Sequence, residues 1–252
     1  MDTKIALITG ASRGLGRSMA LHLAASGLDV IGTFRNGATD ASAVAHEIEA
    51  RGRGAAMLRL DVGRSDTFPD FTETLARTLR DTFGRDRLDI LINNAGADGR
   101  AMIADVTEAM FDELVNVHFK GPFFLTQRLL PLIADGGRII NISSGLARIT
   151  LPGRSAYAAN KGAVEVFTRY LARELGPRGI TANVIAPGAI ATDFGGGILR
   201  DDPDVNRQVA SMIALGRVGE ADDIGEAVAA IVSRGTGWIN GQRIEVSGGQ
   251  QL

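Results

Sequence analysis

Tyr157 and Lys161 stand four residues apart at the start of a segment with a helical pattern. This spacing puts both side chains on one face of a helix. A free tyrosine, with a pKa of about 10, is a poor acid–base catalyst at neutral pH, but a fixed cation beside it favours the phenolate and lowers that pKa. The pair is therefore a candidate for proton transfer, although the same spacing alone is more often a coincidence of the surface.

Two hydroxyl groups make the candidate stronger, because Ser143 and Ser144 close the apolar run that begins at Arg138. Such a run predicts a buried strand. Ligands of open α/β sheets bind at the carboxyl ends of strands. The serines would thus lie at the edge of the sheet where a substrate would bind.

A glycine-rich turn follows the first apolar run, with Gly10, Gly14, Leu15 and Gly16 between Ile5–Thr9 and a helical pattern. Missing side chains let the backbone approach a pyrophosphate, and the helix N-terminus supplies free N–H groups. The spacing G-x-x-x-G-x-G differs from G-x-G-x-x-G, and no Lys-Ser/Thr pair makes it a P-loop. The alternative is a tight strand-to-helix connection without a ligand.

The second apolar run ends in Phe34, Arg35 and Asn36, where dinucleotide-binding folds usually have an acidic residue for the ribose hydroxyls. Arg35, with Ser12 and Arg13 of the glycine turn, would instead surround a ribose 2′-phosphate. This arrangement favours NADP(H) over NAD(H). The alternative is that Arg35 is a solvated charge at a strand end.

Short apolar runs and longer amphipathic segments alternate from end to end, which predicts a parallel sheet with helices on both faces: an α/β, doubly wound Rossmann-type fold of about seven strands in one domain, 1–252. We expect strands at 5–9, 29–34, 55–60, 89–93, 138–143, 181–186 and 243–246, and helices at 14–26, 40–51, 65–82, 107–133, 155–175 and 222–233. The least regular stretch, 189–216, holds apolar residues around Gly195–Gly197, which favours a substrate lid over a plain surface excursion.

Composition excludes several classes of protein. The 252 residues include 32 glycines and no cysteine, so thiol catalysis, disulfides and Cys-bound metals are absent. Three histidines without metal-ligand spacing favour no metal site. With 27 basic and 29 acidic residues and no long apolar run, we expect neither a nucleic-acid nor a membrane partner, and a cytoplasmic protein.

Together these motifs resemble the short-chain dehydrogenase/reductase family, over essentially the whole chain. The residues that carry the resemblance are Thr9-Gly10 to Gly16, Asp61-Val62, Asn93-Asn94-Ala95-Gly96, Asn116, Ser144, Tyr157 with Lys161, Pro187-Gly188 with Ile190 and Thr192, Gly241-Gln242 and Gly248-Gly249.

The resemblance implies a catalytic role for four side chains. Tyr157 would exchange a proton with the substrate oxygen, and Lys161 would lower the tyrosine pKa and bind the nicotinamide ribose. Ser144 would polarise the carbonyl; Ser143 is the rival hydroxyl, which strand alternation turns to the other face. Asn116 would hold a water molecule behind Lys161, or simply satisfy backbone groups in a helix.

The resemblance also implies which residues contact the cofactor, besides Tyr157 and Lys161. Asp61 would contact adenine, or cap the helix that follows it; Asn94 is expected to stabilise strands instead. The full set of expected cofactor contacts is Gly10, Ser12, Arg13, Gly14, Leu15, Gly16, Arg35, Asn36, Asp61, Val62, Asn93, Ala95, Gly96, Pro187, Gly188, Ile190 and Thr192.

The expected activity is an NADPH-dependent reduction of a ketone, or the reverse oxidation of a secondary alcohol, most like the 3-oxoacyl-carrier-protein reductases and related ketone or sugar reductases. The alternative is a non-catalytic NADP(H)-sensing protein.

Substrate contacts are expected from Asp98, Arg100, Leu146, Arg148 and Ile149, with Arg154 as a further cation. A second apolar stripe on the helix 155–175 (Ala163, Val166, Tyr170) indicates burial against a neighbour. The resemblance implies that this helix and the preceding one, 107–133, form an oligomer interface, and we predict a homotetramer. Trp238 is expected in packing or a subunit contact, and His118 is the one histidine near the site, although all three are taken as structural.

Overall fold

The computed structural model describes residues 3–252 and contains one parallel sheet of seven strands in the order β3-β2-β1-β4-β5-β6-β7. The strand order reverses between β1 and β4, where open α/β sheets form their ligand crevice. The predicted doubly wound α/β fold is confirmed. The strands are β1 (Ile5–Ile8), β2 (Asp29–Phe34), β3 (Ala55–Arg59), β4 (Leu88–Asn93), β5 (Ile133–Ile142), β6 (Thr181–Pro187) and β7 (Arg243–Val246).

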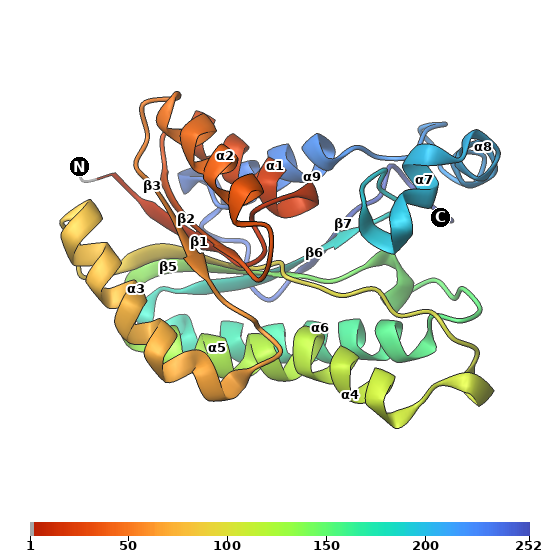
Figure 1. Cartoon of the computed structure of the whole chain (residues 1–252), viewed down its shortest axis with the longest axis horizontal. Coiled ribbons are helices and arrows are strands. Elements are labelled where there is room, and N and C mark those ends of the chain that lie inside the picture. Colours follow the sequence, from red (N-terminus) through yellow and green to blue (C-terminus); the bar gives the residue numbers. More distant parts are fainter. Residues whose placement is uncertain (1–2) are drawn as a thin grey trace.

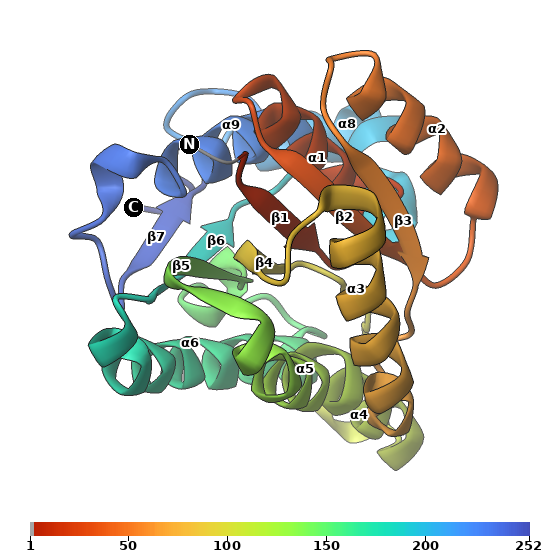
Figure 2. The ribbon, with the colours of Figure 1, turned by 90° about the vertical axis from the view of Figure 1, so that its left-hand side faces the viewer.

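Helices cover both faces of the sheet (Figures 1 and 2). One layer consists of α1 (Gly14–Ala25), α2 (Ala38–Glu49) and α9 (Ala221–Ile231), and the other of α3 (Phe68–Phe83), α5 (Gly121–Leu129) and α6 (Ser155–Leu175). Successive residues of β1 pack into opposite cores: Leu7 lies with the cluster under α3, α5 and α6, and Ile8 with the cluster under α1 and α9. Both faces are therefore buried, which explains the continuous apolar runs. No helix of residues 3–252 has the length and apolarity to cross a membrane.

Local signals account for several helix ends. Pro69 stands in the first turn of α3, and Gly84 ends that helix with a left-handed backbone at φ 63°. Glu220 and Asp223 form a capping box at the start of α9. These features place α3 and α9 within one or two residues of the predicted ranges, once the 3₁₀ turn Ser65–Thr67 before α3 is taken into account.

The helix predicted at 107–133 is four segments, the last being the 3₁₀ turn Leu130–Leu132, so that expectation was wrong in detail. α4 (Glu108–Val115) passes into a π-helical turn, Asn116–Lys120, and then into α5. The N–H of Gly121 donates to the carbonyl of Asn116, five residues earlier. A Cβ atom at Gly121 would lie 2.3 Å from the Val62 carbonyl oxygen. Close contact with the Asp61-Val62 loop therefore accompanies the widened turn, and β5 already begins at Ile133.

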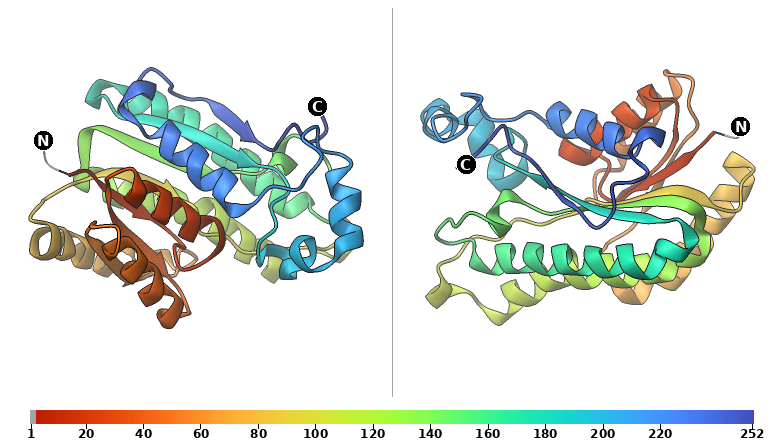
Figure 3. Two further views of the ribbon diagram at one scale, coloured as in Figure 1. Left: turned by 90° about the horizontal axis from the view of Figure 1, so that it is seen from above. Right: turned by 180° about the vertical axis from the view of Figure 1, so that it is seen from behind.

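The predicted lid region, 189–216, has more regular structure than the sequence suggested, with two short helices, α7 (Ile198–Asp201) and α8 (Pro203–Ala210). Three successive glycines, Gly195–Gly197, have φ values of 69°, 78° and 77°, a left-handed backbone that other residues rarely adopt. The far end of the segment pairs with the C-terminal residues through Ile213 and Gln250. Figure 3 shows this segment at the same end of the molecule as the C-terminus.

Candidate active site

Tyr157 and Lys161 lie on the first turns of α6, below the carboxyl end of β5, and are only 7% and 5% exposed. The Lys161 Nζ atom is 5.5 Å from the centroid of the tyrosine ring, as the i,i+4 spacing predicts. The same Nζ donates to the Ile142 carbonyl oxygen at 2.8 Å. The end of β5 thus fixes the ammonium group beside the phenol.

The two serines after β5 have different surroundings. Ser143 is buried and its Oγ donates to Glu165 Oε1 at 2.7 Å, away from the tyrosine. Ser144 lies beside Tyr157 and lowers the pKa of its phenol, and the Ser144 Oγ accepts from the Leu146 N–H at 3.2 Å. The geometry therefore brings Ser144, and not Ser143, to the phenol.

The electrostatics of the pair differ from the sequence expectation. Burial raises the pKa of Tyr157 to about 12, while the hydrogen bond from Ser144 and the charge of Arg154 lower it in part. Burial also lowers the pKa of Lys161 to about 8. The expectation that the tyrosine pKa lies below its ordinary value was wrong for this arrangement, because desolvation of the buried phenol outweighs the effects of Ser144 and Arg154. Tyr157 is a protonated acid at neutral pH.

The residue that packs on Tyr157 from the π-helical turn is His118. The two rings meet edge to face, with centroids 5.0 Å apart and an angle of 84° between the planes. Asn116 begins the turn, is half-buried and makes no side-chain hydrogen bond to any residue of 3–252. Its predicted role stays a prediction. Sequence reasoning took His118 as structural, and the only signal was its place two residues after Asn116.

The glycine turn between β1 and α1 is locked in place by its neighbours. Gly10 and Gly14 have φ values of 70° and 53°, and a Cβ atom at Gly16 would lie 2.0 Å from the Gly10 carbonyl oxygen. The Asn94 side chain donates to the carbonyls of Thr9 and Gly10 at 2.8 and 3.1 Å. Asn94 therefore stabilises the turn, in line with the expectation for that residue.

The glycine turn is open on the side of the segment after β6. A Cβ atom at Gly14 would meet only Thr192, at 4.0 Å, so a glycine here leaves room between the turn and the segment after β6. The N-terminus of α1 faces this room with no acidic side chain in its first turn. Free N–H groups and an open approach suit a pyrophosphate, so the residues fit the expected cofactor.

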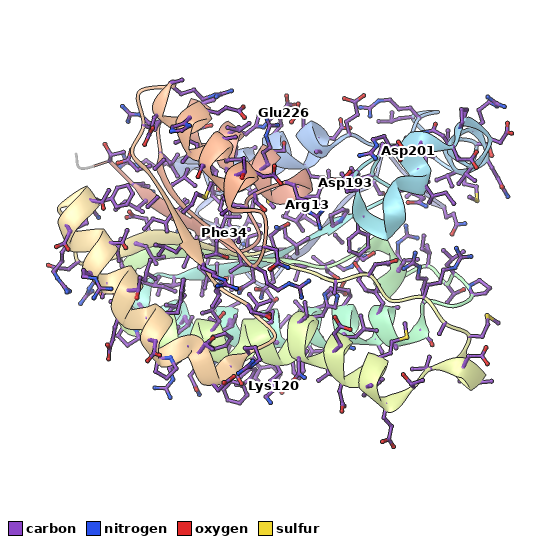
Figure 4. The ribbon with its side chains drawn as sticks, in the orientation of Figure 1. Arg13, Phe34, Lys120, Asp193, Asp201 and Glu226 are labelled. Atoms are coloured by element: carbon purple, nitrogen blue, oxygen red, sulfur yellow. The ribbon has the colours of Figure 1, made fainter. Side chains whose placement is uncertain are left out.

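Two arginines near the turn have no acidic partner among residues 3–252. Arg13 precedes α1 and Arg35 follows Phe34 at the end of β2; both are exposed, like Asn36, whereas Ser12 is half-buried. Arg17 on the next turn of α1 is instead paired with Glu47 at 2.7 Å. Figure 4 shows Arg13 and Phe34 at the same end of the sheet. The two cations are therefore free to bind an anion, and the predicted contact with a 2′-phosphate stays a prediction.

The residues after β3 and β4 only partly match their expected contacts. Asp61 Oδ1 accepts from the Gly63 N–H at 2.9 Å, and Val62 is buried. The Asn93 amide points away from the crevice and donates to Thr126 and Asn141. Any contact of Asn93 with a cofactor would therefore come from its backbone. Ala95 donates its N–H to Thr9 Oγ1 at 3.0 Å, and Gly96 lies against His118.

The segment after β6 runs along the other side of the crevice. Pro187 ends the strand, and the Gly188 N–H donates to the Val246 carbonyl at 3.0 Å. Ile190 pairs with Gly219, and the Thr192 hydroxyl accepts from the Phe194 N–H at 3.3 Å. Leu15 packs on the core beside this segment, on the side of α1.

The side chains expected to meet substrate are largely engaged with one another. Arg154 pairs with Asp98, and Arg148 pairs with Glu245 at 2.6 Å and with the carbonyls of Gln250 and Gln251. The Phe194 ring lies 6.0 Å from the Tyr157 ring and is 47% exposed. The mouth of the site is therefore apolar at Phe194, with Arg148 and Arg154 neutralised. Arg100, the third expected cation, is exposed and has no acidic partner among residues 3–252.

Comparisons with known proteins agree with this geometry. A family model described as enoyl-(acyl carrier protein) reductase matches residues 10–251. The 3-oxoacyl-[acyl-carrier-protein] reductase FabG of Staphylococcus aureus is 35% identical, with 99% of each chain covered. Among solved structures, the promiscuous reductase LugOII, which catalyses keto-reduction at C1 during lugdunomycin biosynthesis, has a TM-score of 0.94 at 39% identity, covering 100% of this chain and 99% of that one. The angucycline C-6 ketoreductase LanV with bound NADP has a TM-score of 0.93 at 39% identity, covering 99% and 96%.

A doubly wound sheet with a glycine turn after β1 and a Tyr–Lys pair on α6 defines a nicotinamide-dependent oxidoreductase. The chain belongs to the short-chain dehydrogenase/reductase family, as its motifs predicted. It is an oxidoreductase that interconverts a ketone and a secondary alcohol. Nothing in these comparisons favours the alternative of a non-catalytic sensor.

Proposed function

We propose that the protein reduces a ketone with NADPH and that Tyr157 supplies the proton. The observation that carries this proposal is the buried Tyr157, fixed between Ser144 and the Lys161 ammonium. When bound, the nicotinamide would supply the hydride. Ser144 polarises the carbonyl as a neutral donor, and Tyr157, protonated at neutral pH, gives its proton to the oxygen as negative charge develops. Lys161 then stabilises the phenolate that remains.

Replacing Tyr157 by Phe tests this assignment. The substitution keeps the ring and removes the transferable proton, so we expect kcat for ketone reduction to fall by about 10²-fold or more. NADPH binding, measured by the fluorescence of the cofactor, should stay within about threefold of wild type, since an ordinary neutral hydrogen bond accounts for about tenfold at most. A variant that retains the wild-type kcat would remove Tyr157 from the mechanism.

We also propose that the enzyme prefers NADP(H) to NAD(H), because Arg13 and Arg35 are exposed cations beside the turn, without acidic partners among residues 3–252. Arg35→Asp should weaken NADPH binding by about 10- to 100-fold, since charge-assisted bonds to phosphate are worth about 1.5–3 kcal/mol, and should leave NADH binding nearly unchanged. Arg17→Ala is the matched control, because Arg17 is paired with Glu47. Unchanged selectivity in the Arg35 variant would contradict the proposal.

The mouth of the site favours a neutral, largely apolar ketone over an anionic substrate. The Phe194 ring covers the tyrosine, and Ile198 and Met212 of the lid segment are 46% and 40% exposed. Arg148 and Arg154, two of the expected contacts for an anion, are already paired with carboxylates. LugOII, described as catalysing keto-reduction at C1 during lugdunomycin biosynthesis, and LanV, described as an angucycline C-6 ketoreductase, support a ketone substrate. A 3-oxoacyl thioester is the second candidate, supported by the similarity to FabG.

A panel of ketones distinguishes these candidates. NADPH oxidation would be followed with a fused-ring aromatic ketone, a bicyclic aliphatic ketone and acetoacetyl-CoA. The proposal expects a higher kcat/KM for the polycyclic ketones, and Phe194→Ala should reduce it mainly through KM, because the ring provides apolar contact area rather than chemistry. A clear preference for acetoacetyl-CoA would favour the thioester reductase instead.

We propose further that four chains assemble. Val166 and Tyr170 of α6 are 45% and 64% exposed, and Phe124 of α5 is 41% exposed beside the same helix layer. Trp238, in the loop before β7, is fully exposed, so packing within the chain does not explain it and a subunit contact remains. Two separate apolar surfaces fit a closed assembly with two kinds of interface. A need for NADPH fits a cytoplasmic enzyme.

A further inference from the structure

His118 is a buried polar residue that the proposed reaction does not yet use. Its side chain is 1% exposed, and its Nδ1 atom has no hydrogen-bond partner among residues 3–252. Buried polar atoms are almost always paired, so an unpaired one at an active site calls for a ligand or a water molecule. The edge-to-face contact with Tyr157 places this imidazole directly against the proposed proton donor.

The hydrogen bonds of the ring decide its tautomer. Nε2 lies 2.7 Å from the Ala97 carbonyl oxygen, and the Ala97 N–H also points at Nε2, at 3.2 Å. The two contacts require opposite tautomers, and we assign the ring by the shorter one. A bare Nε2 lone pair would repel a carbonyl oxygen at 2.7 Å, so Nε2 carries the hydrogen and donates it. Nδ1 is then a bare acceptor. Burial and the charge of Lys161 lower the pKa of His118 to about 3, which keeps the ring neutral at physiological pH.

The Nδ1 edge of the ring packs closely on Gly96 and is closed to solvent. A Cβ atom at Gly96 would lie 3.0 Å from Cε1 and 3.7 Å from Nδ1 of His118, so only the absence of a side chain at Gly96 leaves this edge unblocked. Gly96 itself is exposed and lies in the turn after β4, beside the crevice. A donor can therefore approach Nδ1 only from the side of this glycine, with a small displacement of the turn.

We propose that His118 is a positioning residue of the proton-transfer site, whose ring edge orients Tyr157 and whose Nδ1 accepts a hydrogen bond from a hydroxyl group that enters beside Gly96. The donor is either a ribose hydroxyl of the bound cofactor or a water molecule. The proposal rests on the proposed role of Tyr157. His118 does not carry the proton, because its neutral form is strongly favoured; it fixes the geometry in which Tyr157 transfers one.

Two substitutions test the Nδ1 acceptor and the aromatic ring of His118 separately. His118→Phe keeps an aromatic edge and removes Nδ1, whereas His118→Asn loses the ring and keeps an acceptor near the Nδ1 position. We expect kcat to fall about tenfold in the Phe variant, the upper end of the effect of losing an ordinary neutral hydrogen bond, and to recover to within about threefold of wild type in the Asn variant. Melting temperatures verify that both variants fold.

NADPH binding, followed by cofactor fluorescence, identifies the donor. A Kd about tenfold weaker in the Phe variant supports the ribose hydroxyl, and an unchanged Kd with a lower kcat supports water. Gly96→Ala is a second test, because its Cβ atom would lie 3.0 Å from Cε1 of His118 and block the approach to Nδ1, and it should lower kcat in the same direction.

The proposal is overturned if His118→Phe has wild-type kcat and Kd, if the Phe and Asn variants lose activity equally, or if Gly96→Ala is fully active. The Tyr157→Phe variant separates a failure of the inference about His118 from a failure of the proposed active site. An inactive Tyr157→Phe beside a fully active His118→Phe rejects only the inference about His118, whereas an active Tyr157→Phe rejects the proposed site itself.

Discussion

At the scale of single residues, burial controls the acid–base behaviour of this site more than charge does. Tyr157, Lys161 and His118 are each less than a tenth exposed. Desolvation disfavours the charged form of each group, so it raises the pKa of the phenol and lowers the pKa of the amine and of the imidazole. At neutral pH Tyr157 is therefore a protonated acid, Lys161 is a cation close to its pKa, and His118 is a neutral hydrogen-bond acceptor.

This setting predicts how ketone reduction depends on pH. Below the Lys161 pKa of about 8 the ammonium is present, and above it the amine becomes neutral and no longer stabilises the tyrosinate. We therefore expect kcat/KM for reduction to be constant at neutral pH and to decline with an apparent pKa near 8, while Tyr157, with its pKa of about 12, stays protonated throughout. The measurement is a pH profile of NADPH-dependent reduction.

Lys161→Met provides the control for that profile. Its activity should be low at every pH, and the decline near pH 8 should disappear, because no amine remains to titrate. A decline that persists unchanged in this variant would assign the titration to another group.

At the scale of the elements, the π-helical turn between α4 and α5 brings the site together. The N–H of Gly121 reaches back to the Asn116 carbonyl, and this wider turn carries His118 inward against Tyr157. π-Helical turns of this kind occur frequently at functional sites. The turn also packs on the Asp61-Val62 loop, so the proton-transfer residues and the expected adenine contact share one support.

Gly121→Ala should disturb this turn. The added Cβ atom would lie 2.3 Å from the Val62 carbonyl and 2.8 Å from that of Asn116, so something must shift. We expect the free energy of unfolding to fall by about 1–3 kcal/mol, the usual effect of overpacking. Gly162→Ala is the matched control, since a Cβ atom on this helical glycine of α6 would meet no atom within 4 Å and alanine is the better helix former by about 0.5–1 kcal/mol. Equal melting temperatures for the two variants would contradict the argument.

The sequence was sufficient for the elements but not for this turn. Apolar periodicity placed all seven strands and located α6 at its observed bounds, because buried strands and an amphipathic helix have distinct patterns. The residues of 107–133 have a continuous helical pattern, and nothing local distinguishes i,i+5 from i,i+4 bonding. The widened turn is seen only with its tertiary contact to Val62, so the position of His118 could not be predicted.

Side-chain directions at the site were also predictable where they depend on local pattern and not where they depend on tertiary contacts. Strand alternation predicted that Ser143 and Ser144 face opposite ways, and their hydrogen bonds agree. The sign of the pKa shift of Tyr157 was wrong, since the depth of burial of a helix residue depends on the whole sheet above it. Asn93 was expected at the cofactor, and its amide is instead bonded to Thr126 and Asn141 across neighbouring elements.

At the scale of the whole molecule, exposed apolar side chains remain on α5 and α6 after the chain has folded. Phe123 and Phe167 stack at 4.6 Å between these helices, while Phe124, Val166 and Tyr170 face outward. A monomer rarely leaves large contiguous apolar patches in water. Covering this helix layer with a second copy would bury them.

Tyr170→Glu should weaken the proposed tetramer, because it places a charge in an apolar interface. Light scattering should give four times the 26.5 kDa chain mass for the wild type and a smaller mass for the variant. Ala43→Glu, at an exposed position of α2 on the opposite helix layer, is the control and should leave the mass unchanged. A wild-type mass of one chain would contradict the assembly itself.

The pairing of the lid segment with the C-terminal residues has a practical consequence for handling the protein. The Leu215 N–H donates to the Gly248 carbonyl at 3.0 Å, the Ala189 N–H donates to the Gln250 side chain at 2.9 Å, and Arg148 binds the carbonyls of Gln250 and Gln251. A purification tag or surface linker attached after Leu252 would disturb the hydrogen bonds between the C-terminal residues and the lid segment. Fusions belong at the opposite end of the sheet, where the chain enters β1 far from the mouth of the site (Figure 1).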